Sequence, residues 1–339
     1  GYQNTEQKCK ILGIFVDGCA VDIIGQDQRA VVVLDQTPFY AESGGQVGDT
    51  GKLITENAVF LVEDTQKQGK TFLHIGIIDS GSLRKGDSVH AEIDNDLREA
   101  IKRNHSATHL MHAALRDVLG DHVQQKGSLV TAERTRFDFS HFEPVTREQI
   151  YSIERQVNAQ IMHNIETRDV EMPLVEAKKA GAMALFGEKY GDKVRVLSFG
   201  DLSTELCGGT HVNRVGEIGQ FKIVSESAIG SGVRRITAVA GEAAVKYIQD
   251  MEKQLQEVAQ TLKVSPEAAP PMLKQVLEQN RQLEKDLSAM KSSMASSGSD
   301  TLLDNVIEIN GIKVLSARVD DLDASGLRDS VDHLKDRLG

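Results

Sequence analysis

Residues 94–120 read DNDLREAIKRNHSATHLMHAALRDVLG, and this stretch predicts a long helix around which the rest of the chain is organised. Its apolar side chains recur every three or four residues, which is the spacing of one buried helix face. Asp94 is a plausible N-cap, and Gly120 ends the pattern. The apolar positions are Leu97, Ala100, Ile101, Ala107, Leu110, Met111, Ala114, Leu115 and Val118. We therefore expect a long helix that is partly buried.

Two pairs of residues have metal-binding chemistry. His105 and His109 lie four positions apart on the predicted helix, so both imidazoles project from one face. Roughly 100 residues later, the run CGGTH at 207–211 offers the Cys207 thiolate and the His211 imidazole on a glycine-rich loop that can bring them to one point. One cysteine and three histidines suit zinc. A lone histidine pair is more often part of a core, but two matched pairs favour the metal.

The residues alone leave the chemistry of this site open. Position 106 is serine, whereas the HExxH metalloproteases have their glutamate base there, so that class is excluded in its usual form. Zinc can polarise a carbonyl or activate a water, but either role needs an open coordination position. Four protein ligands close a tetrahedral ion, so a purely structural zinc is the competing interpretation.

The regions on either side of this helix differ in their patterns. Before it, short β-branched runs alternate with glycine-rich turns, which is typical of a small all-β barrel or sandwich. These runs cover 11–16, 29–34, 58–63, 72–78 and 88–93. After it, a helix at about 147–163 is surrounded by strand-like stretches at 128–131, 136–139, 194–199, 220–227 and 233–240. This second pattern is typical of an α+β domain with helices on an antiparallel sheet.

The pattern changes again from residue 242 onward. Apolar residues step by threes and fours over 242–262 and 273–290, on either side of a proline-rich turn. This predicts two helices that fold back on each other as an antiparallel hairpin, with Asn280 on the seam.

The end of the chain predicts a linker and a further domain. The Ser- and Gly-rich residues 292–299 are typical of a flexible linker. A β-hairpin around Asn310-Gly311 and a helix from Asp323 then follow. We thus expect an α+β protein made of a small β-barrel, a zinc-binding α+β core, a helical hairpin linker and the start of a truncated α/β domain. These four parts cover residues 1–93, 94–241, 242–296 and 297–339.

The composition limits the partners. A net charge of -11 argues against non-specific binding to nucleic acid, so we expect no DNA partner and only local RNA contacts. Candidates for such contacts are Arg98, Lys102, Arg103, Lys126, Arg234 and Arg235. No apolar run approaches the roughly 20 residues of a membrane span, so we expect no membrane role. Three cysteines make no disulfide framework, which predicts a cytoplasmic protein. Without an initiator Met or signal segment, the sequence suggests a fragment of a longer protein.

Several runs together resemble the alanyl-tRNA synthetase family. Four runs resemble its editing domain: HSATHL at 105–110, QKGS at 125–128, FGEKYGD at 186–192 and CGGTH at 207–211. FYAESGGQVGD at 39–49 is similar to the family's glycine-rich β-barrel, and GSGVRRI at 230–236 is similar to its closing motif. Zinc pairs alone occur also in threonyl-tRNA synthetases and free-standing alanyl-tRNA deacylases. The barrel run, zinc pairs, helical hairpin and C-terminal hairpin in this order are similar to the alanyl enzyme.

This resemblance implies an editing activity for residues 94–241. The reaction is hydrolysis of the ester that joins serine or glycine wrongly to tRNA(Ala), because a synthetase pocket shaped for a methyl group cannot strongly reject an added hydroxyl. Residues 297–339 would begin a tRNA-binding and oligomerisation domain, and a homo-oligomer would form through its missing remainder. ATP and Mg²⁺ serve only the aminoacylation domain of the family, which no part of this chain resembles.

The resemblance also implies residue roles. One Zn²⁺ would be held by His105, His109, Cys207 and His211. The catalytic residues would be Gln125, Thr108 and Cys207, and substrate would be bound by Thr108, Gln125, Gly44, Gly45, Gln46 and Arg234. Thr108 and Gln125 are the polar candidates for recognising the substrate hydroxyl, although a threonine inside a helix often bonds a preceding carbonyl instead. The rival functions are a free-standing aminoacyl-tRNA deacylase and a non-catalytic tRNA-binding module with a structural zinc.

Overall fold

The computed structural model of the protein describes residues 4–183, 191–318, 327–328, 331–332 and 334–336. The chain forms two compact units, Gly1–Gln249 and Asp250–Gly339. The first unit contains a β-barrel, two antiparallel sheets and the helix that bears the histidine pair. None of the helices in the described residues combines the length and the apolar composition that a membrane span requires.

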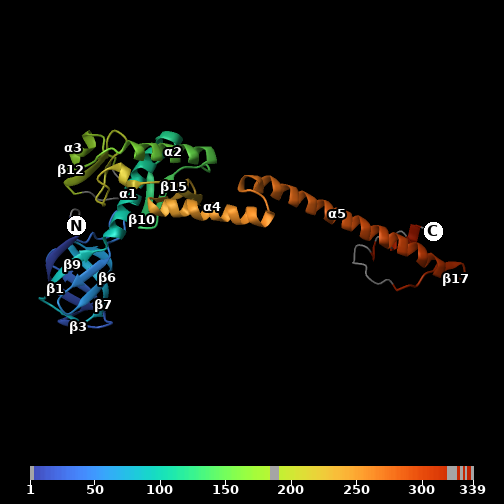
Figure 1. The fold of residues 1–339 in the computed structure, drawn as a ribbon, viewed down its shortest axis with the longest axis horizontal. Coiled ribbons are helices and arrows are strands. Elements are labelled where there is room, and N and C mark those ends of the chain that lie inside the picture. Colours follow the sequence, from blue (N-terminus) through green and yellow to red (C-terminus); the bar gives the residue numbers. More distant parts are fainter. Residues whose placement is uncertain (1–3, 184–190, 319–326, 329–330, 333, 337–339) are drawn as a thin grey trace. The chain divides into compact units, whose positions relative to one another are not determined.

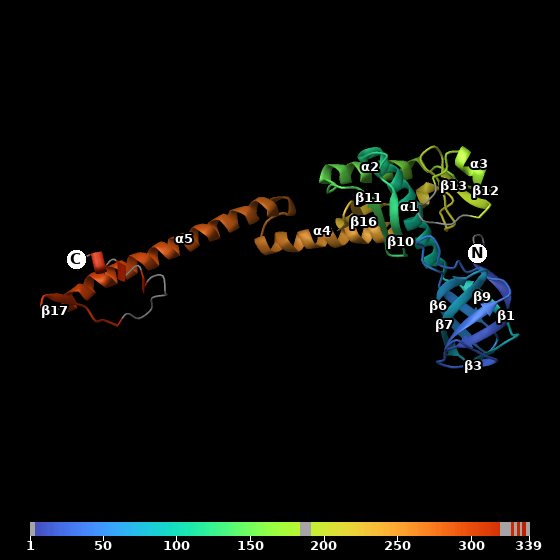
Figure 2. The ribbon, with the colours of Figure 1, turned by 180° about the vertical axis from the view of Figure 1, so that it is seen from behind.

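Six strands of the first unit close into a β-barrel, drawn in blue to cyan in Figure 1 and seen from behind in Figure 2. Their order is β1, β4, β7, β6, β5 and β9, and β9 pairs with β1 to close the barrel. The bounds are Glu6–Val16 (β1), Arg29–Leu34 (β4), Gly51–Ile54 (β5), Val59–Gln68 (β6), Thr71–Ser80 (β7) and Ser88–Ile93 (β9). Alternate side chains point inward, and Val32, Leu53 and Phe60 are buried there. Of the two predicted architectures, the barrel is therefore the one that forms.

Three very short strands complete this region. Cys19–Val21 (β2) pairs with β1, and Ile23–Gly25 (β3) pairs with Ser82–Arg84 (β8). The sequence prediction missed these strands and β5 because three or four residues are too few to show an alternating pattern.

Helix α1, Asn95–Leu119, matches the predicted helix at both ends. The Asp94 side chain accepts a hydrogen bond from the Leu97 backbone N–H, and Gly120 follows the last helical residue with a φ of 113°. The helix buries the face on which His105 and His109 lie, so both imidazoles enter the interior.

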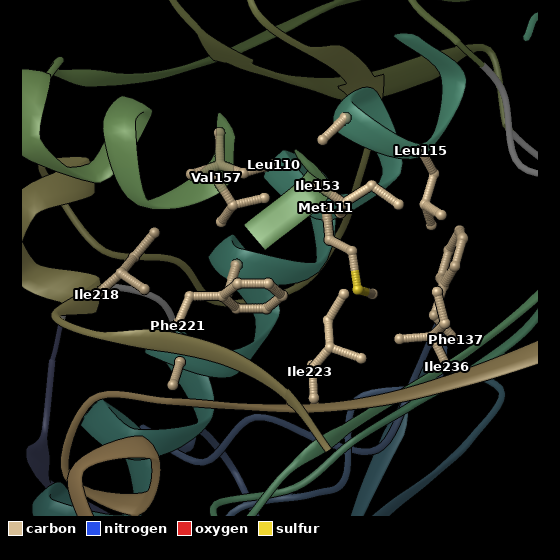
Figure 3. Close-up of a cluster of buried hydrophobic side chains, with 14 of the residues drawn as sticks. Leu110, Met111, Leu115, Phe137, Ile153, Val157, Ile218, Phe221, Ile223 and Ile236 are labelled. Atoms are coloured by element: carbon tan, nitrogen blue, oxygen red, sulfur yellow. The ribbon is translucent and has the colours of Figure 1, made fainter. Parts of the chain in front are cut away.

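A four-stranded antiparallel sheet packs against α1 and a second helix. The sheet order is β10 (Gln125–Val130), β11 (Thr135–Ser140), β16 (Val233–Ala240) and β15 (Phe221–Gly230). Helix α2, Arg147–His163, coincides with the predicted helix and begins with a capping box between Thr146 and Gln149. The core between helices and sheet contains the buried side chains of Leu110, Met111, Leu115, Phe137, Ile153, Val157, Ile218, Phe221, Ile223 and Ile236 (Figure 3). The predicted α+β middle region is confirmed.

A smaller sheet leads into the second ligand pair. Strands β12 (Thr167–Pro173), β13 (Lys193–Phe199) and β14 (Thr204–Leu206) pair antiparallel, beside helix α3, Leu174–Lys179, and the short helix η1, Val215–Ile218, follows. Cys207 comes directly after β14. The strand therefore fixes where the CGGTH run enters the core.

The barrel is joined to the α1 core by a buried ion pair. The Arg98 guanidinium, on α1, donates to the Asp49 carboxylate of the barrel, and Arg98 Nη2 also donates to the Pro38 carbonyl at 3.2 Å. Both charged side chains are 2% exposed. The sequence prediction of Arg98 as an RNA contact is therefore wrong, because its charge is already satisfied inside the protein.

The C-terminal elements correct two predictions. Helices α4, Glu242–Leu262, and α5, Ala269–Leu302, form on either side of the short helix η2, Pro266–Ala268. Residues 292–299, predicted to be a flexible linker, lie inside α5, because serine, alanine and methionine tolerate a helix and a single glycine costs only about 1 kcal/mol.

The predicted seam between these helices is not packed. Leu255 and Val258 of α4 are 44% and 45% exposed, and Leu283 and Leu287 of α5 are 65% and 57% exposed. A closed antiparallel hairpin would bury these side chains, so the structure shows the two helices without the packed hairpin.

The last elements lie at the edge of what the structure describes. The β-hairpin around Asn310-Gly311 is confirmed as β17 (Ile307–Ile309) and β18 (Ile312–Val314). Its turn has positive φ at both central residues, as a tight two-residue hairpin requires. The helix predicted from Asp323 falls mostly outside the described residues.

Candidate metal centre

The four predicted ligands come together in one buried cluster. His105 and His109 lie one turn apart on α1, and Cys207 and His211 lie on the loop after β14. One nitrogen or sulfur atom from each residue lies within 4.8 Å of the other three. Cys207 Sγ is 3.6 Å from His105 Nε2 and 3.3 Å from His211 Nε2. The pairing of two distant segments, expected from the sequence, is therefore present in the structure.

Each imidazole of the cluster is held from behind through its Nδ1 atom. His105 Nδ1 lies 2.7 Å from Gln46 Oε1, and His109 Nδ1 lies 2.7 Å from Glu205 Oε2. His211 Nδ1 lies 3.3 Å from Ser106 Oγ. With the Nδ1 atoms engaged outward, the Nε2 atoms are available at the centre of the cluster. Histidine ligands in metal sites have this arrangement, because the outer hydrogen bond fixes the tautomer and the ring orientation.

Two separations in the cluster match those of a tetrahedral zinc site. For Zn–N bonds of about 2.0–2.1 Å and a Zn–S bond of about 2.3 Å, a tetrahedron places nitrogen and sulfur about 3.6 Å apart. The two sulfur-to-nitrogen distances at Cys207 are close to this separation. His109 Nε2 is buried and has no hydrogen-bond partner among the described residues. Because a buried polar atom without a partner is costly, this nitrogen points to a missing ligand.

The electrostatics of Cys207 and His211 favour the forms that bind a metal. Burial raises the pKa of the Cys207 thiol, but the neighbouring His105, His211 and His109 outweigh burial and hold it well below its usual value. Burial and the charge of His105 lower the pKa of His211 to about 3. A thiolate beside a neutral imidazole is the protonation state that zinc ligands need.

Glu205 raises the basicity of a third imidazole, that of His109, and favours its protonated form. Burial lowers the pKa of His109, but the Glu205 carboxylate and Cys207 more than offset this and raise it to about 10. Glu205 also lies 3.1 Å from both His112 Nδ1 and Ser203 Oγ. The sequence prediction missed Glu205, although its position two residues before Cys207 was a usable signal, since ligand histidines commonly bond a carboxylate.

The ligand loop has room for no side chain at Gly209. A Cβ atom there would lie 2.1 Å from His105 Cε1 and 2.8 Å from Gln46 Oε1. Arg195 Nη1 donates to the Gly209 carbonyl at 2.6 Å and holds the loop from the other side. The first of the two central glycines, Gly208, lines the neighbouring cavity.

A cavity of about 410 Å³ opens beside the cluster. His105 and Cys207 form part of its wall, and Gly44 of the barrel loop forms another part. The cationic residues Lys67, Lys193 and Arg195 also line it, and the sequence prediction included none of them among the RNA contacts. A substrate with a negatively charged backbone could therefore place its reactive end next to the cluster.

The remaining predicted site residues have other surroundings. Thr108 Oγ1 donates to the Asn104 carbonyl at 2.7 Å and lies 2.6 Å from Thr135 Oγ1, which is the alternative role of a helical threonine. Gln125 is half-buried on β10, opposite Phe139 of β11. Their proposed roles in substrate recognition stay predictions.

Three further predicted substrate-binding residues are fixed by protein contacts. Gly45 packs so tightly on β10 that a Cβ atom would lie 2.4 Å from the Ser128 carbonyl oxygen. Arg234 donates from Nη2 to Glu226 at 2.7 Å, and its side chain is 11% exposed. Gln46 is fully buried and bonds His105, as described above. Arg234 is therefore engaged in an ion pair rather than presented on the surface.

Comparison with known proteins relates the chain to aminoacyl-tRNA synthetases. Residues 1–97 match the family of class II (A) tRNA synthetases, and residues 194–237 match the second additional domain of threonyl and alanyl tRNA synthetases. Over all of its length the chain is 54% identical to an alanine--tRNA ligase of Delftia acidovorans, and it covers 39% of that protein. It is 53% identical to the alanine--tRNA ligases of Polaromonas sp. and Hydrogenovibrio crunogenus, of which it covers 38% and 39%. The chain thus spans about two fifths of the length of these relatives.

Proposed function

We propose that this chain, which is related over its whole length to alanine--tRNA ligases, hydrolyses the ester of tRNA(Ala) mischarged with serine or glycine. The observation that supports this most directly is the buried cluster of His105, His109, Cys207 and His211 beside a cavity lined by lysine and arginine. We take the cluster to hold one Zn²⁺. The joining of alanine to tRNA, with ATP and Mg²⁺, is not part of this proposal.

A bound zinc would supply Lewis-acid chemistry at an ester carbonyl or at a water. The protein's own groups perform the remaining tasks. His105 and Cys207 form part of the cavity wall, and Lys67 and Lys193, which also line the cavity, would attract phosphates of an acceptor strand. The Nδ1 partners Gln46, Glu205 and Ser106 hold the imidazoles in fixed orientations.

Selectivity would come from hydrogen bonds to the substrate. A site that bonds the hydroxyl of serine leaves its own polar groups unpaired when alanine enters, and so spares the correct product. We assign this task to Thr108 and Gln125. Thr108 Oγ1 donates its hydrogen to Asn104 and so accepts from Thr135, which leaves one lone pair that can accept a hydrogen bond from a substrate hydroxyl.

The second candidate function is a tRNA-binding module in which the zinc only stabilises the fold. Four protein ligands favour it, because they complete a tetrahedral shell and leave no position for substrate. On this reading the cationic cavity would bind the acceptor end without reaction.

The test is single-turnover deacylation of serine-charged tRNA(Ala) by the purified chain. We expect Cys207→Ala and Gln125→His to lose about 100-fold or more in rate in protein that stays folded, because the groups that stabilise the transition state are misplaced. The matched control is Cys19→Ala, since Cys19 is an exposed cysteine of the barrel. Activity that falls only in step with the folded fraction would favour the structural zinc instead.

A further inference from the structure

The β-barrel inserts one amide side chain into the metal cluster. Gln46 lies on the loop between β4 and β5, in a tight turn where its backbone N–H and the Ser43 carbonyl are 3.0 Å apart. Its side chain has no exposed surface and lies 59 positions from His105 in the chain. A polar side chain buried this completely is retained in a core only when its hydrogen bonds are satisfied.

The hydrogen bonds of Gln46 determine which way its amide faces. The Thr210 backbone N–H donates to Gln46 Oε1 at 2.9 Å, and Gln46 Nε2 donates to Thr210 Oγ1 at 2.9 Å. A backbone N–H can only donate, so the amide atom that meets it must be the oxygen. The same oxygen lies 2.7 Å from His105 Nδ1. Because an amide oxygen can only accept, His105 must carry a proton on Nδ1.

This proton determines what His105 presents to the cluster. A neutral imidazole protonated on Nδ1 has its lone pair on Nε2, and that atom faces Cys207 Sγ at 3.6 Å. A lone pair opposite a thiolate is repulsive unless a proton or a metal ion lies between them. One buried amide therefore places both His105 and the Thr210 backbone of the ligand loop in the arrangement that suits a metal.

The loop that bears Gln46 is itself anchored on the core. The Val130 N–H donates to the Gly45 carbonyl at 2.7 Å, and the Val47 N–H donates to the Val130 carbonyl at 3.1 Å. These two bonds bracket Gln46 and attach the loop to β10. The amide is thus held before any metal arrives.

We propose that Gln46 is a positioning residue of the metal centre, through which the β-barrel completes the site that α1 and the CGGTH loop begin. This differs from the substrate-binding role expected from the sequence. The neighbouring Ser43 and Gly44 line the cavity. Gln46 is not one of the described residues that line it. The inference rests on the proposed metal site and adds a residue outside the four ligands.

The test measures metal binding in the full chain, with a chelator of known affinity as competitor. Gln46→Met keeps the size of the side chain and removes its acceptor, so we expect the zinc dissociation constant to rise about 10- to 100-fold. Gln46→Glu keeps an acceptor for both His105 and Thr210 and should stay close to wild type. The matched control is Gln68→Met, on an exposed position of the same barrel, which should have no effect.

Cobalt(II) gives a second readout. In the wild type we expect the absorption bands of a tetrahedral ion with one thiolate ligand, and in Gln46→Met weaker or shifted bands. If Gln46→Met does not fold, Thr210→Val takes its place, because it removes the hydroxyl that accepts from Gln46 Nε2 and should shift zinc affinity in the same direction by a smaller factor.

The outcomes separate this inference from the proposed function. Wild-type zinc affinity and an unchanged cobalt spectrum in folded Gln46→Met, or in Thr210→Val as its substitute, would overturn the positioning role, whether or not the chain hydrolyses mischarged tRNA. If zinc affinity falls in Gln46→Met but stays near wild type in Gln46→Glu, the positioning role is established. This holds even if the chain does not hydrolyse mischarged tRNA and the proposed function fails.

Discussion

The behaviour of each buried histidine in this protein depends on what faces its two ring nitrogens. At the metal cluster, Nδ1 meets an amide, a carboxylate or a hydroxyl, and Nε2 is left for the ion. His74, inside the barrel, has both nitrogens occupied: Nδ1 lies 2.9 Å from the Val32 carbonyl and Nε2 lies 2.8 Å from Thr37 Oγ1. The same residue type is thus a candidate ligand in one core and a neutral packing element in another.

His74 predicts a pH dependence of stability. Burial lowers its pKa to about 4 from an ordinary value of 6.5, so the folded barrel excludes a proton that the unfolded chain binds. The stabilisation is complete above about pH 6.5 and is lost as pH falls toward 4. Between pH 7 and pH 5 we expect His74 to remove about 2 kcal/mol of unfolding free energy. Urea unfolding of zinc-free wild type and His74→Gln at both pH values measures this, and equal pH slopes would refute it.

Thr108 predicts a change in selectivity. Thr108→Val replaces the hydroxyl by a methyl of similar size and removes the contacts with Asn104 and Thr135. If the hydroxyl recognises serine in the proposed reaction, the ratio of deacylation rates for serine- and alanine-charged tRNA should fall by about 10-fold or more. Thr135→Val serves as control, because it removes the contact partner on β11. If this ratio of deacylation rates is unchanged in folded Thr108→Val, the hydroxyl does not recognise serine, and its role is the hydrogen bond to Asn104 within the helix.

At the scale of elements, the sequence predicted those whose pattern is long and local. Residues Asp94 and Gly120 mark the ends of α1, and the capping box at Thr146 marks the start of α2. The clustering of His105, His109, Cys207 and His211 was predictable as well, because two spaced pairs of His and Cys suggest a shared site. The contacts of Gln46 with His105 and of Arg98 with Asp49 were not predictable. These partners lie 59 and 49 positions apart, and no local pattern encodes such contacts.

The loop between β14 and η1 gives a prediction at this scale. Gly209→Ala would place a methyl group 2.1 Å from the His105 ring, so either the ring or the loop must move. We expect zinc affinity to fall by about 10-fold or more while the barrel and the α1 core stay folded. Gly230→Ala is the control, because a Cβ atom at that position meets nothing within 4 Å. Zinc content after dialysis, measured together with circular dichroism, decides between the two outcomes.

At the scale of the whole first unit, buried polar contacts link the barrel to the core that carries the candidate metal cluster. The Arg98–Asp49 pair attaches the start of α1 to the barrel, and Gln46 attaches the barrel loop to the ligands. Both links are buried, so water competes little with them. A mutation in the barrel should therefore be felt at a metal centre that the barrel does not itself ligate.

The ion pair gives the test of this coupling. Removing one partner of a buried pair leaves an uncompensated charge, so we expect Arg98→Met and Asp49→Asn each to cost about 3–5 kcal/mol of unfolding free energy. The double variant leaves no buried charge, so its loss of unfolding free energy should be much smaller than the sum of the two single losses. A double-mutant cycle measures this difference as a coupling energy.

The same variants test the effect on the metal centre. Because Asp49 also accepts from the Tyr40 N–H, three residues before Ser43, the single variants should loosen the Gln46 loop and raise the zinc dissociation constant. Thermal unfolding and chelator competition on the same four proteins test both effects. The exposed pair Arg29–Glu63 on the barrel is the control, and its removal should cost about 0–1 kcal/mol with no change in zinc affinity. If the losses of unfolding free energy in Arg98→Met and Asp49→Asn add in the double variant, and zinc affinity is unchanged, the barrel and the metal centre are independent.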